Sequence, residues 1–274
     1  MTARVQPPVV LPGTRPGGAE NEAAASRQVR EMFSGIAPHY DLLNHLLSLR
    51  FDILWRRRVA RRFRSVLTSP RARVLDLCCG TGDLALALAR EAAPAQAERA
   101  AASGSARSMV IGADFAHPML VLACRKSAAV SGERRAVFLE ADALALPFAD
   151  ETFDLVTTAF GFRNLANYRS GLAEFRRVLR PGGSLAILEF SEPRSALFGS
   201  LFAFYFRRVL PRIGGIISGN AGAYGYLPRS VRRFPQPPEL AQWVIEAGFT
   251  QVGFERWTGG IVALHTGQRG NADS

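Results

Sequence analysis

The sequence has few cysteines, fewer acidic than basic residues and no long apolar run. Its three cysteines (Cys78 and Cys79 adjacent, Cys124 alone) lack the paired spacing of a disulfide framework or a zinc site. No uninterrupted apolar stretch is long enough to cross a bilayer, and the first residues contain no signal-peptide core. We therefore expect a cytoplasmic protein without a metal site, with peripheral association at the inner face of the membrane left open.

The net charge only partly limits the kinds of partner that the protein could bind. The 34 basic residues, nearly all arginine, exceed the 23 acidic ones and give a net charge of +11. Coding bias explains an arginine excess, while nucleic acid or an anionic membrane would also attract it. With 48% hydrophobic residues, the chain can form one sizeable core. Residues 1–27 lack periodicity and are predicted to be a disordered tail, with a single domain over 28–274.

The stretch 73–83 predicts a buried strand that turns directly into a helix. An apolar run at 74–77 is followed by Cys-Cys-Gly-Thr-Gly at 78–82, and a helical pattern begins at Asp83. Glycines at such a turn allow conformations and close approaches that a side chain prevents. The spacing Asp-x-x-x-Gly-x-Gly differs from the dinucleotide motif, and the lysine of a P-loop is missing. The turn therefore favours S-adenosylmethionine, a ligand without phosphates.

Acidic residues end the next two predicted strands. The second strand, 109–115, carries Asp114, and the third, 136–143, carries Asp142. In nucleotide-binding folds of this kind, a carboxylate at the tip of the second strand accepts hydrogen bonds from ribose hydroxyls. Asp142 would reach an adenine amine, with Ala143 or Leu144 as a wall for the ring. Asp114 could instead cap the next helix; the glycine turn one helix upstream favours the ribose role.

The later part of the chain continues the alternation of strands and helices. Strands at 153–160 and 184–190 predict a parallel sheet with helices on its faces. Two final runs, 250–257 and 261–266, are joined by Thr-Gly-Gly and predict an antiparallel pair. We therefore predict an α/β fold, a Rossmann-like seven-stranded sheet of the class I methyltransferase type that is mostly parallel and ends in an antiparallel hairpin.

Two segments before the sheet predict an N-terminal helical lid over 28–70. Residues 29–44 predict a helix, a turn at Gly35 and Pro38, and a second short helix that places polar groups near the turn. Helix capping by Asp41 and Asn44 explains the same residues equally well. Residues 51–67 predict an amphipathic helix with arginines on its polar face. A solvated face is the default for those arginines, and contact with acidic lipid is the alternative.

Two further segments interrupt the regular pattern. Residues 196–219 are rich in phenylalanine, leucine and isoleucine and contain no acidic residue. We interpret 192–235 as an apolar helical cap, inserted after the fifth strand, that forms a greasy pocket or touches a bilayer; plain core packing is the alternative. The alanine-rich stretch 93–108 is an insertion that either lengthens the preceding helix or forms a loop, and we assign no function to it.

Six blocks of sequence carry a resemblance to a known family. They are YDLLN at 40–44, LDLCCGTGD at 75–83, AFGFRN at 159–164, LEFS at 188–191, LPRIG at 210–214 and GIVALH at 260–265. Together they resemble the menaquinone and ubiquinone biosynthesis C-methyltransferase family, over about residues 29–267. The Gly-Thr-Gly turn is generic to the superfamily, whereas the Phe-Gly-x-Arg-Asn, Leu-Pro-Arg-Ile-Gly and Val-Ala-Leu-His blocks are more particular.

The resemblance implies methyl transfer from S-adenosyl-L-methionine to a ring carbon of a polyprenyl quinol. The Cys-Cys-Gly-Thr-Gly form favours demethylmenaquinol, with the methoxy-benzoquinol of the ubiquinone pathway as the alternative. The predicted cofactor residues are Asp76, Gly80, Thr81, Gly82, Asp114, Asp142 and Ala143. The predicted substrate contacts are Tyr40, Phe160, Phe162 and Arg163. The chain departs from some relatives at Ala159, where they carry a serine. A homodimer through the apolar cap is left open.

The chemistry of ring methylation suggests which residues act on the quinol. An aromatic carbon becomes a good nucleophile when a neighbouring hydroxyl ionises, and that hydroxyl should have a pKa of about 10, like tyrosine. Arg163 could stabilise the developing oxyanion, with Asn164 fixing the orientation of the ring. The candidate proton acceptors are His39, Asp41 and His265. A histidine on a strand is more often structural, which makes His265 the weaker candidate.

Two other functions compete with this prediction. Methylation of RNA or protein is compatible with the basic charge, but we find no RNA-binding module and expect no nucleic-acid partner. The Asn-Pro-Pro-Tyr signature of many amide and base N-methyltransferases is also missing after the fourth strand, where Gly-Phe-Arg-Asn stands. A non-catalytic scaffold would not need an intact glycine turn and its acidic residues.

Overall fold

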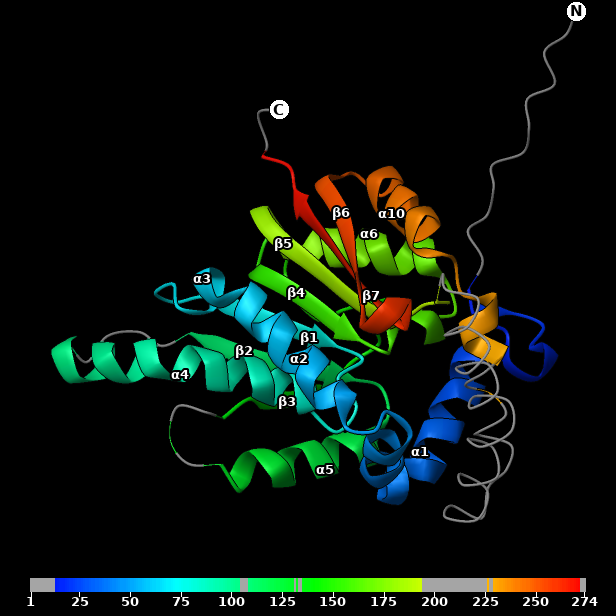
Figure 1. The fold of residues 1–274 in the computed structure, drawn as a ribbon, viewed down its shortest axis with the longest axis horizontal. Coiled ribbons are helices and arrows are strands. Elements are labelled where there is room, and N and C mark those ends of the chain that lie inside the picture. The colour runs from blue at the N-terminus through cyan, green and yellow to red at the C-terminus, as the bar shows by residue number, and fades with distance from the viewer. Residues whose placement is uncertain are drawn as a thin grey trace, which may run out of the picture.

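The computed structural model describes residues 13–103, 108–130, 132, 135–193, 226 and 229–271. Its seven-stranded sheet has the order β3-β2-β1-β4-β5-β7-β6 (Figure 1). The strands are β1 (Arg73–Leu77), β2 (Met109–Asp114), β3 (Val137–Glu140), β4 (Phe153–Ala159), β5 (Leu179–Phe190), β6 (Phe249–Trp257) and β7 (Val262–Arg269). The pairs among β1 to β5 are parallel, whereas β7 is antiparallel to both β5 and β6. The predicted fold is confirmed.

Helices cover both faces of the sheet, which is why its central strands are continuous apolar runs. On one face, α2 (Phe51–Arg62), α3 (Arg64–Leu67) and α4 (Asp83–Ser103) pack with one set of strand side chains, including Val74 and Leu155. On the other face, α6 (Tyr168–Val178) and α10 (Pro237–Glu246) pack with the alternate set, including Leu75 and Val156. Helix α5 (His117–Ala128) packs on β2 and β3 (Figure 1).

The N-terminal segment differs from the sequence prediction. A single helix, α1 (Glu22–Leu47), replaces the expected helix-turn-helix and keeps Pro38 inside it. Ile36 and Ala37 are buried against Met119 of α5, so tertiary packing holds the helix together across the proline. The α1 helix lies beside one end of α5 (Figure 1).

The predicted disordered tail is wrong for residues 13–27. This stretch contains a 3-10 turn, η1 (Pro16–Gly18), and the start of α1. Thr14 donates its backbone N–H to Leu165 O at 2.8 Å, and its hydroxyl lies 2.9 Å from that of Tyr226. Arg15 donates from Nη1 to Ala166 O at 2.6 Å. Long-range partners of this kind cannot be read from a segment without periodicity.

Several element boundaries also differ from the prediction. The helix predicted over 51–67 breaks at Phe63, and two of its apolar residues, Phe51 and Leu54, are exposed. The α4 helix continues to Ser103, so the first part of the insertion lengthens the helix, which is one of the two alternatives left open for it. The third strand ends at Glu140, so Asp142 lies just beyond it.

Part of the predicted cap cannot be compared with the structure. Most of 192–235, including the apolar run 196–217, lies outside the described residues. Among the residues that are described, no helix is long and apolar enough to cross a membrane.

Candidate active site

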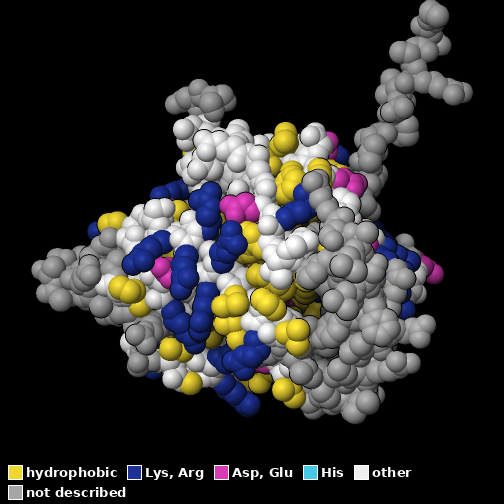
Figure 2. Space-filling view, viewed as in Figure 1, with side chains coloured by type: hydrophobic (Ala, Val, Ile, Leu, Met, Phe, Trp, Pro, Cys, Tyr) yellow, Lys and Arg dark blue, Asp and Glu magenta, His cyan; other side chains and the backbone are white. Residues whose placement is uncertain are grey.

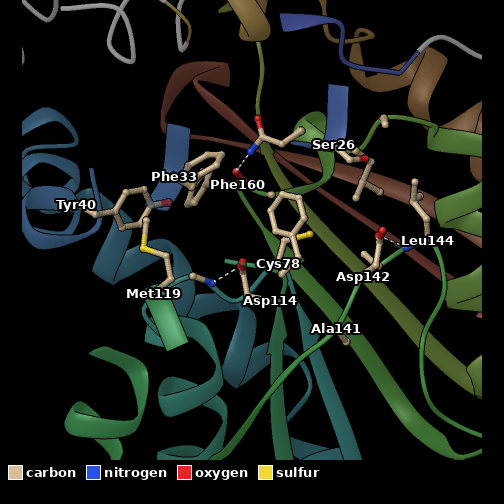
Figure 3. Close-up of a pocket in the computed structure, with 17 residues that line it drawn as sticks. Ser26, Phe33, Tyr40, Cys78, Asp114, Met119, Ala141, Asp142, Leu144 and Phe160 are labelled. Carbon is tan, nitrogen blue, oxygen red and sulfur yellow. Dashed lines mark hydrogen bonds between the residues drawn. The ribbon is translucent and has the colours of Figure 1, made fainter. Parts of the chain in front are cut away.

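A cleft of about 640 Å³, including its open mouth, lies at the carboxyl ends of β1, β2 and β4. This is the edge of an open α/β sheet where ligands bind. Seven of the residues predicted for the site line it: Tyr40, Gly80, Asp114, Asp142, Ala143, Phe160 and Asn164. They come from α1, from the turn after β1, and from the ends of β2, β3 and β4 (Figure 3). The topology therefore brings together residues that are far apart in the sequence.

The turn after β1 has the conformation that its glycines predicted. Cys78, Gly80 and Gly82 have φ values of 52°, 53° and 83°, in the left-handed region that glycine adopts most easily. A Cβ at Gly82 would lie 2.6 Å from Phe138 Cζ, whereas one at Gly80 would meet only Tyr40, at 3.7 Å. Gly82 is therefore needed for packing, and Gly80 leaves open backbone facing the cleft.

Asp114 holds this turn against the end of β2. Its Oδ2 accepts the Gly80 N–H at 2.9 Å (Figure 3). Its Oδ1 accepts the Ala116 N–H, also at 2.9 Å. Burial raises the pKa of this carboxyl, and the two backbone N–H groups oppose that rise. A carboxylate has about four acceptor positions, so each oxygen can accept a further hydrogen bond from the cleft.

Asp142 is fixed by a local turn just after β3. Its Oδ1 accepts the Leu144 N–H at 2.9 Å (Figure 3). The side chain of Asp142 is half-buried and lines the cleft together with Ala141, Ala143 and Leu144. A hydrogen-bond acceptor thus stands beside small and apolar side chains.

Three of the predicted cofactor residues do not line the cleft. Asp76 is buried in β1, where its Oδ1 accepts from Thr157 Oγ1 at 2.8 Å. Burial raises its pKa to about 7. Thr81 is also buried, and its hydroxyl is bonded to Asp41 and Lys126. Gly82 faces Phe138. All three support the turn that Gly80 presents to the cleft.

The two predicted phenylalanines have different surroundings. Phe160, with φ 61°, lines the cleft and packs on Trp55 and Phe190 at ring-centroid distances of 6.0 and 4.6 Å. Phe162 is fully buried between Tyr168 and Phe234. Phe162 does not line the cleft: it is a core residue of the 3-10 turn η3 (Phe162–Asn164).

Arg163 and Asn164 also differ in position. Arg163 is buried and does not line the cleft; its Nη1 lies 2.9 Å from Glu189 Oε2 and also donates to Phe160 O. Asn164 lines the cleft, accepts from Tyr226 OH at 3.0 Å and donates weakly to Phe160 O at 3.4 Å. The guanidinium charge is thus paired within the protein, while the amide faces the cavity.

None of the predicted proton acceptors is described in the cleft. Asp41 does not line it; its carboxylate contacts Thr81 and Lys126. His265 is buried on β7 with Nε2 at 3.0 Å from Pro237 O, and burial lowers its pKa to about 4, which makes it a structural residue. His39 belongs to α1, but its side chain lies outside the described part of the structure.

Sequence reasoning missed part of the lining. From α1 these residues are Ser26 and Phe33, from the turns Cys78 and Gly161, and from the end of β2 and the start of α5 Phe115 and Met119. Cys78 could have been predicted from the sequence, because it belongs to the turn itself. Burial raises the pKa of its thiol well above the usual value. The other residues are apolar or small, and nothing in their local pattern distinguishes lining from core.

Solved structures with a similar fold identify the fold of this chain. A SAM-dependent methyltransferase from Thermotoga maritima matches with a TM-score of 0.57 at 18% identity, over 88% of this chain and 99% of the other. One from Aquifex aeolicus matches with a TM-score of 0.51 at 17% identity, over 77% and 89% of the two chains. With the seven-stranded topology, these likenesses define a class I S-adenosylmethionine-dependent methyltransferase fold.

The sequence places the chain more narrowly. It belongs to the ubiE/COQ5 methyltransferase family, whose model matches residues 21–269. A demethylmenaquinone methyltransferase from Thermus thermophilus is 52% identical over 87% of this chain and all of its own. One from Deinococcus radiodurans is 48% identical over 98% and all of its own. A ubiquinone/menaquinone biosynthesis C-methyltransferase from Geobacter sulfurreducens is 44% identical over 89% of each chain.

Proposed function

We propose that this protein transfers a methyl group from S-adenosyl-L-methionine to a ring carbon of demethylmenaquinol. The observation that carries the proposal is the joint position of Gly80, Asp114 and Asp142 around one cleft in a chain of this family. The names of the relatives from Thermus and Deinococcus favour the menaquinone substrate. The name of the Geobacter relative keeps a ubiquinone-pathway quinol as the alternative.

The residues of the cleft fit this cofactor. Both Asp114 oxygens keep acceptor capacity for ribose hydroxyls after binding Gly80 and Ala116. Asp142 offers an acceptor for an exocyclic amine, and Phe115 and Leu144 offer apolar surface for a purine. A sulfonium cofactor held by these residues would supply an electrophilic methyl group for the ring carbon, with the electron pair of the S–CH3 bond remaining on sulfur as a neutral thioether.

The protein's own groups orient the quinol. Asn164 faces the cleft, and its amide is held by Tyr226 and by Phe160 O. We therefore propose that Asn164 orients the hydroxyl group of the quinol ring. Arg163 supports the same turn from behind: its backbone N–H and Nη1 both bind Glu189, and Nη1 also binds Phe160 O. We therefore assign Arg163 a positioning role rather than direct stabilisation of an oxyanion. A geometry fixed in advance lowers the barrier by removing orientational entropy.

A methyl-transfer assay tests the proposal. We expect transfer of labelled methyl to demethylmenaquinol, less to a ubiquinone-precursor quinol and none to bulk RNA. Asn164→Ala should lower kcat by about a hundredfold while S-adenosylhomocysteine binds as before. Gln242→Ala, which changes an exposed amide on α10, is the control and should leave kcat unchanged. Labelled RNA would favour the competing function, and normal turnover by Asn164→Ala would remove that residue from the mechanism.

We further propose that the enzyme meets its substrate at an anionic membrane. The corner between α1 and α2 exposes Leu42, Leu49, Phe51 and Leu54, at 59%, 70%, 41% and 56% of their surfaces. Exposed Arg50, Arg57 and Arg61 lie next to them in the sequence. Figure 2 shows basic side chains gathered in a band beside apolar side chains on one face of the molecule. Apolar groups bordered by arginines are the pattern of an interfacial anchor.

A further inference from the structure

A cluster of charges outside the cleft joins α1 to the glycine turn. Lys126 of α5 lies at its centre: its Nζ is 2.6 Å from Asp41 Oδ2, 2.7 Å from Asp83 Oδ1 and 2.9 Å from Thr81 Oγ1. Thr81 in turn donates to Asp41 Oδ1 at 2.5 Å. We refer to Lys126, Asp41, Thr81 and Asp83 as the Lys126 cluster. It connects three elements: α1, the turn with the start of α4, and α5.

Composition singles out the same position. Of the 34 basic residues, Lys126 is the only lysine. An ammonium group has three donors around one point, and here each has an acceptor from a different residue. A guanidinium is a longer planar fork and cannot direct three donors at acceptors that converge on one point. The other basic positions of the chain carry arginine, but the three converging acceptors at position 126 require lysine.

The cluster lies next to residues that line the cleft. Asp41 follows Tyr40, and Thr81 follows Gly80; Tyr40 and Gly80 both line the cleft, and Tyr40 lies near Gly80. The Lys126 charge lies between two carboxylates that would otherwise repel each other. Arg56, which pairs with Asp52, also approaches Asp83, at 3.5 Å. Besides the cluster, α1 is held on α5 by the small apolar group around Ile36 and Met119.

We propose that Lys126 is a positioning residue that fastens α1 and the glycine turn together and so keeps the cofactor cleft formed. Neutralising it leaves Asp41 and Asp83 without the cation between them, and α1 then separates from the turn for a larger fraction of the time. A ligand that binds only when α1 is attached to the turn then has a higher Kd, because a smaller fraction of the protein is in the attached state. The inference rests on the proposed function only in taking S-adenosylhomocysteine as the probe.

Hydrogen exchange of the ligand-free protein measures the attachment of α1 directly. In Lys126→Met, the backbone amides of residues 36–47 should exchange about tenfold faster than in the wild type, while those of β4 and β5 do not change. Arg125→Met, which removes the exposed neighbouring charge on α5, is the matched control and should leave exchange of α1 as it is. Equal protection of the amides of 36–47 from exchange in Lys126→Met and the wild type would overturn this proposal and leave the proposed methyl transfer unaffected.

Calorimetry with S-adenosylhomocysteine measures the consequence for the cleft. We expect Kd to rise about tenfold in Lys126→Met, in Lys126→Arg and in Asp41→Asn, with kcat of the two Lys126 variants at saturating cofactor within about twofold of the wild type. Failure of Lys126→Arg to restore affinity distinguishes the three-acceptor geometry from simple charge. The double variant Asp41→Asn/Lys126→Met should bind no more weakly than either single variant, because both break one connection.

The wild-type protein provides a test that does not depend on any variant folding. As the only lysine, Lys126 can be followed by acetylation with acetic anhydride and peptide mass spectrometry. S-adenosylhomocysteine should slow its acetylation several-fold, because the ligand keeps the cluster closed. Wild type that binds the probe without protecting Lys126 would overturn the proposal. Wild type that does not bind the probe at all would instead overturn the proposed function.

Discussion

At the residue scale, Asp76 shows what burial of a carboxyl does in this fold. It lies in β1 below the turn, 1% exposed, with Oδ1 bonded to Thr157 and without a hydrogen bond at Oδ2. Loss of solvation raises its pKa from 3.8 to about 7, against the opposing effects of Thr157 and Arg56. The neutral form is therefore the one that the folded protein prefers.

Asp76 should make stability fall as the pH rises. The folded state keeps the proton up to about pH 7, whereas the unfolded chain releases it near pH 3.8, so unfolding becomes easier between these values. Three units correspond to about 4 kcal/mol at most. Asp76→Asn cannot lose that proton, so its stability relative to wild type should increase between pH 4 and pH 8. Urea unfolding at several pH values measures this.

A second carboxyl serves as the control for that measurement. Glu246→Gln changes an exposed side chain on α10 and should follow the wild-type curve across the same range. Parallel stability curves for Asp76→Asn and wild type would show that the buried carboxyl is charged in the folded protein.

Polar residues of the cleft could be predicted where local pattern fixes their place. Asp114 and Asp142 follow apolar strands, and parallel strands end at one edge, so their convergence followed from the sequence. The partners of Arg163 and Asp41 could not be predicted in that way. Glu189 and Lys126 lie 26 and 85 positions away, and only the folded chain shows that they neutralise these side chains.

At the element scale, the turn after β1 could be predicted from its local sequence, whereas the continuous α1 helix could not. The turn was predicted because its glycines are required locally, by positive φ and close approach. The α1 helix was predicted as two pieces because Gly35 and Pro38 disfavour a helix interior. Packing of α1 on α5 overrides that local preference. The end of α4 was left open between helix and loop, because an alanine-rich stretch carries little periodic signal.

Gly82→Ala should test the element that the sequence specified best. Its Cβ would stand 2.6 Å from Phe138 Cζ and 3.1 Å from Ala123 Cβ, at a φ of 83°. Strain and overlap together should cost about 2–3 kcal/mol of unfolding free energy, measurable by thermal or urea unfolding.

Two variants test the reason for that loss. Gly253→Ala, where a Cβ meets nothing within 4 Å, should be close to neutral. Adding Phe138→Leu to Gly82→Ala should recover part of the loss if the overlap is its cause. An alanine at 82 tolerated as well as one at 253 would contradict this account of the turn.

At the scale of the whole molecule, the arrangement of apolar and basic surface predicts how the enzyme reaches a lipid-soluble quinol. The left-handed residues Leu49 and Arg50, with φ of 49° and 63°, turn the chain between α1 and α2 and expose Leu49 there. Because α1 also lines the cleft through Phe33 and Tyr40, a membrane contact at this corner would place the lipid next to the helix that borders the site.

Sedimentation with vesicles tests this contact. The protein should bind vesicles that contain anionic lipid, bind neutral ones weakly, and lose most binding as salt screens the arginines. Replacing both Leu49 and Phe51 by serine should weaken binding about tenfold, because their insertion contributes about 1–2 kcal/mol. Ile245→Ser, which changes an exposed apolar residue on α10, should have no effect. If vesicle binding changed neither with salt nor with replacement of Leu49 and Phe51, the membrane contact would lie elsewhere on the molecule.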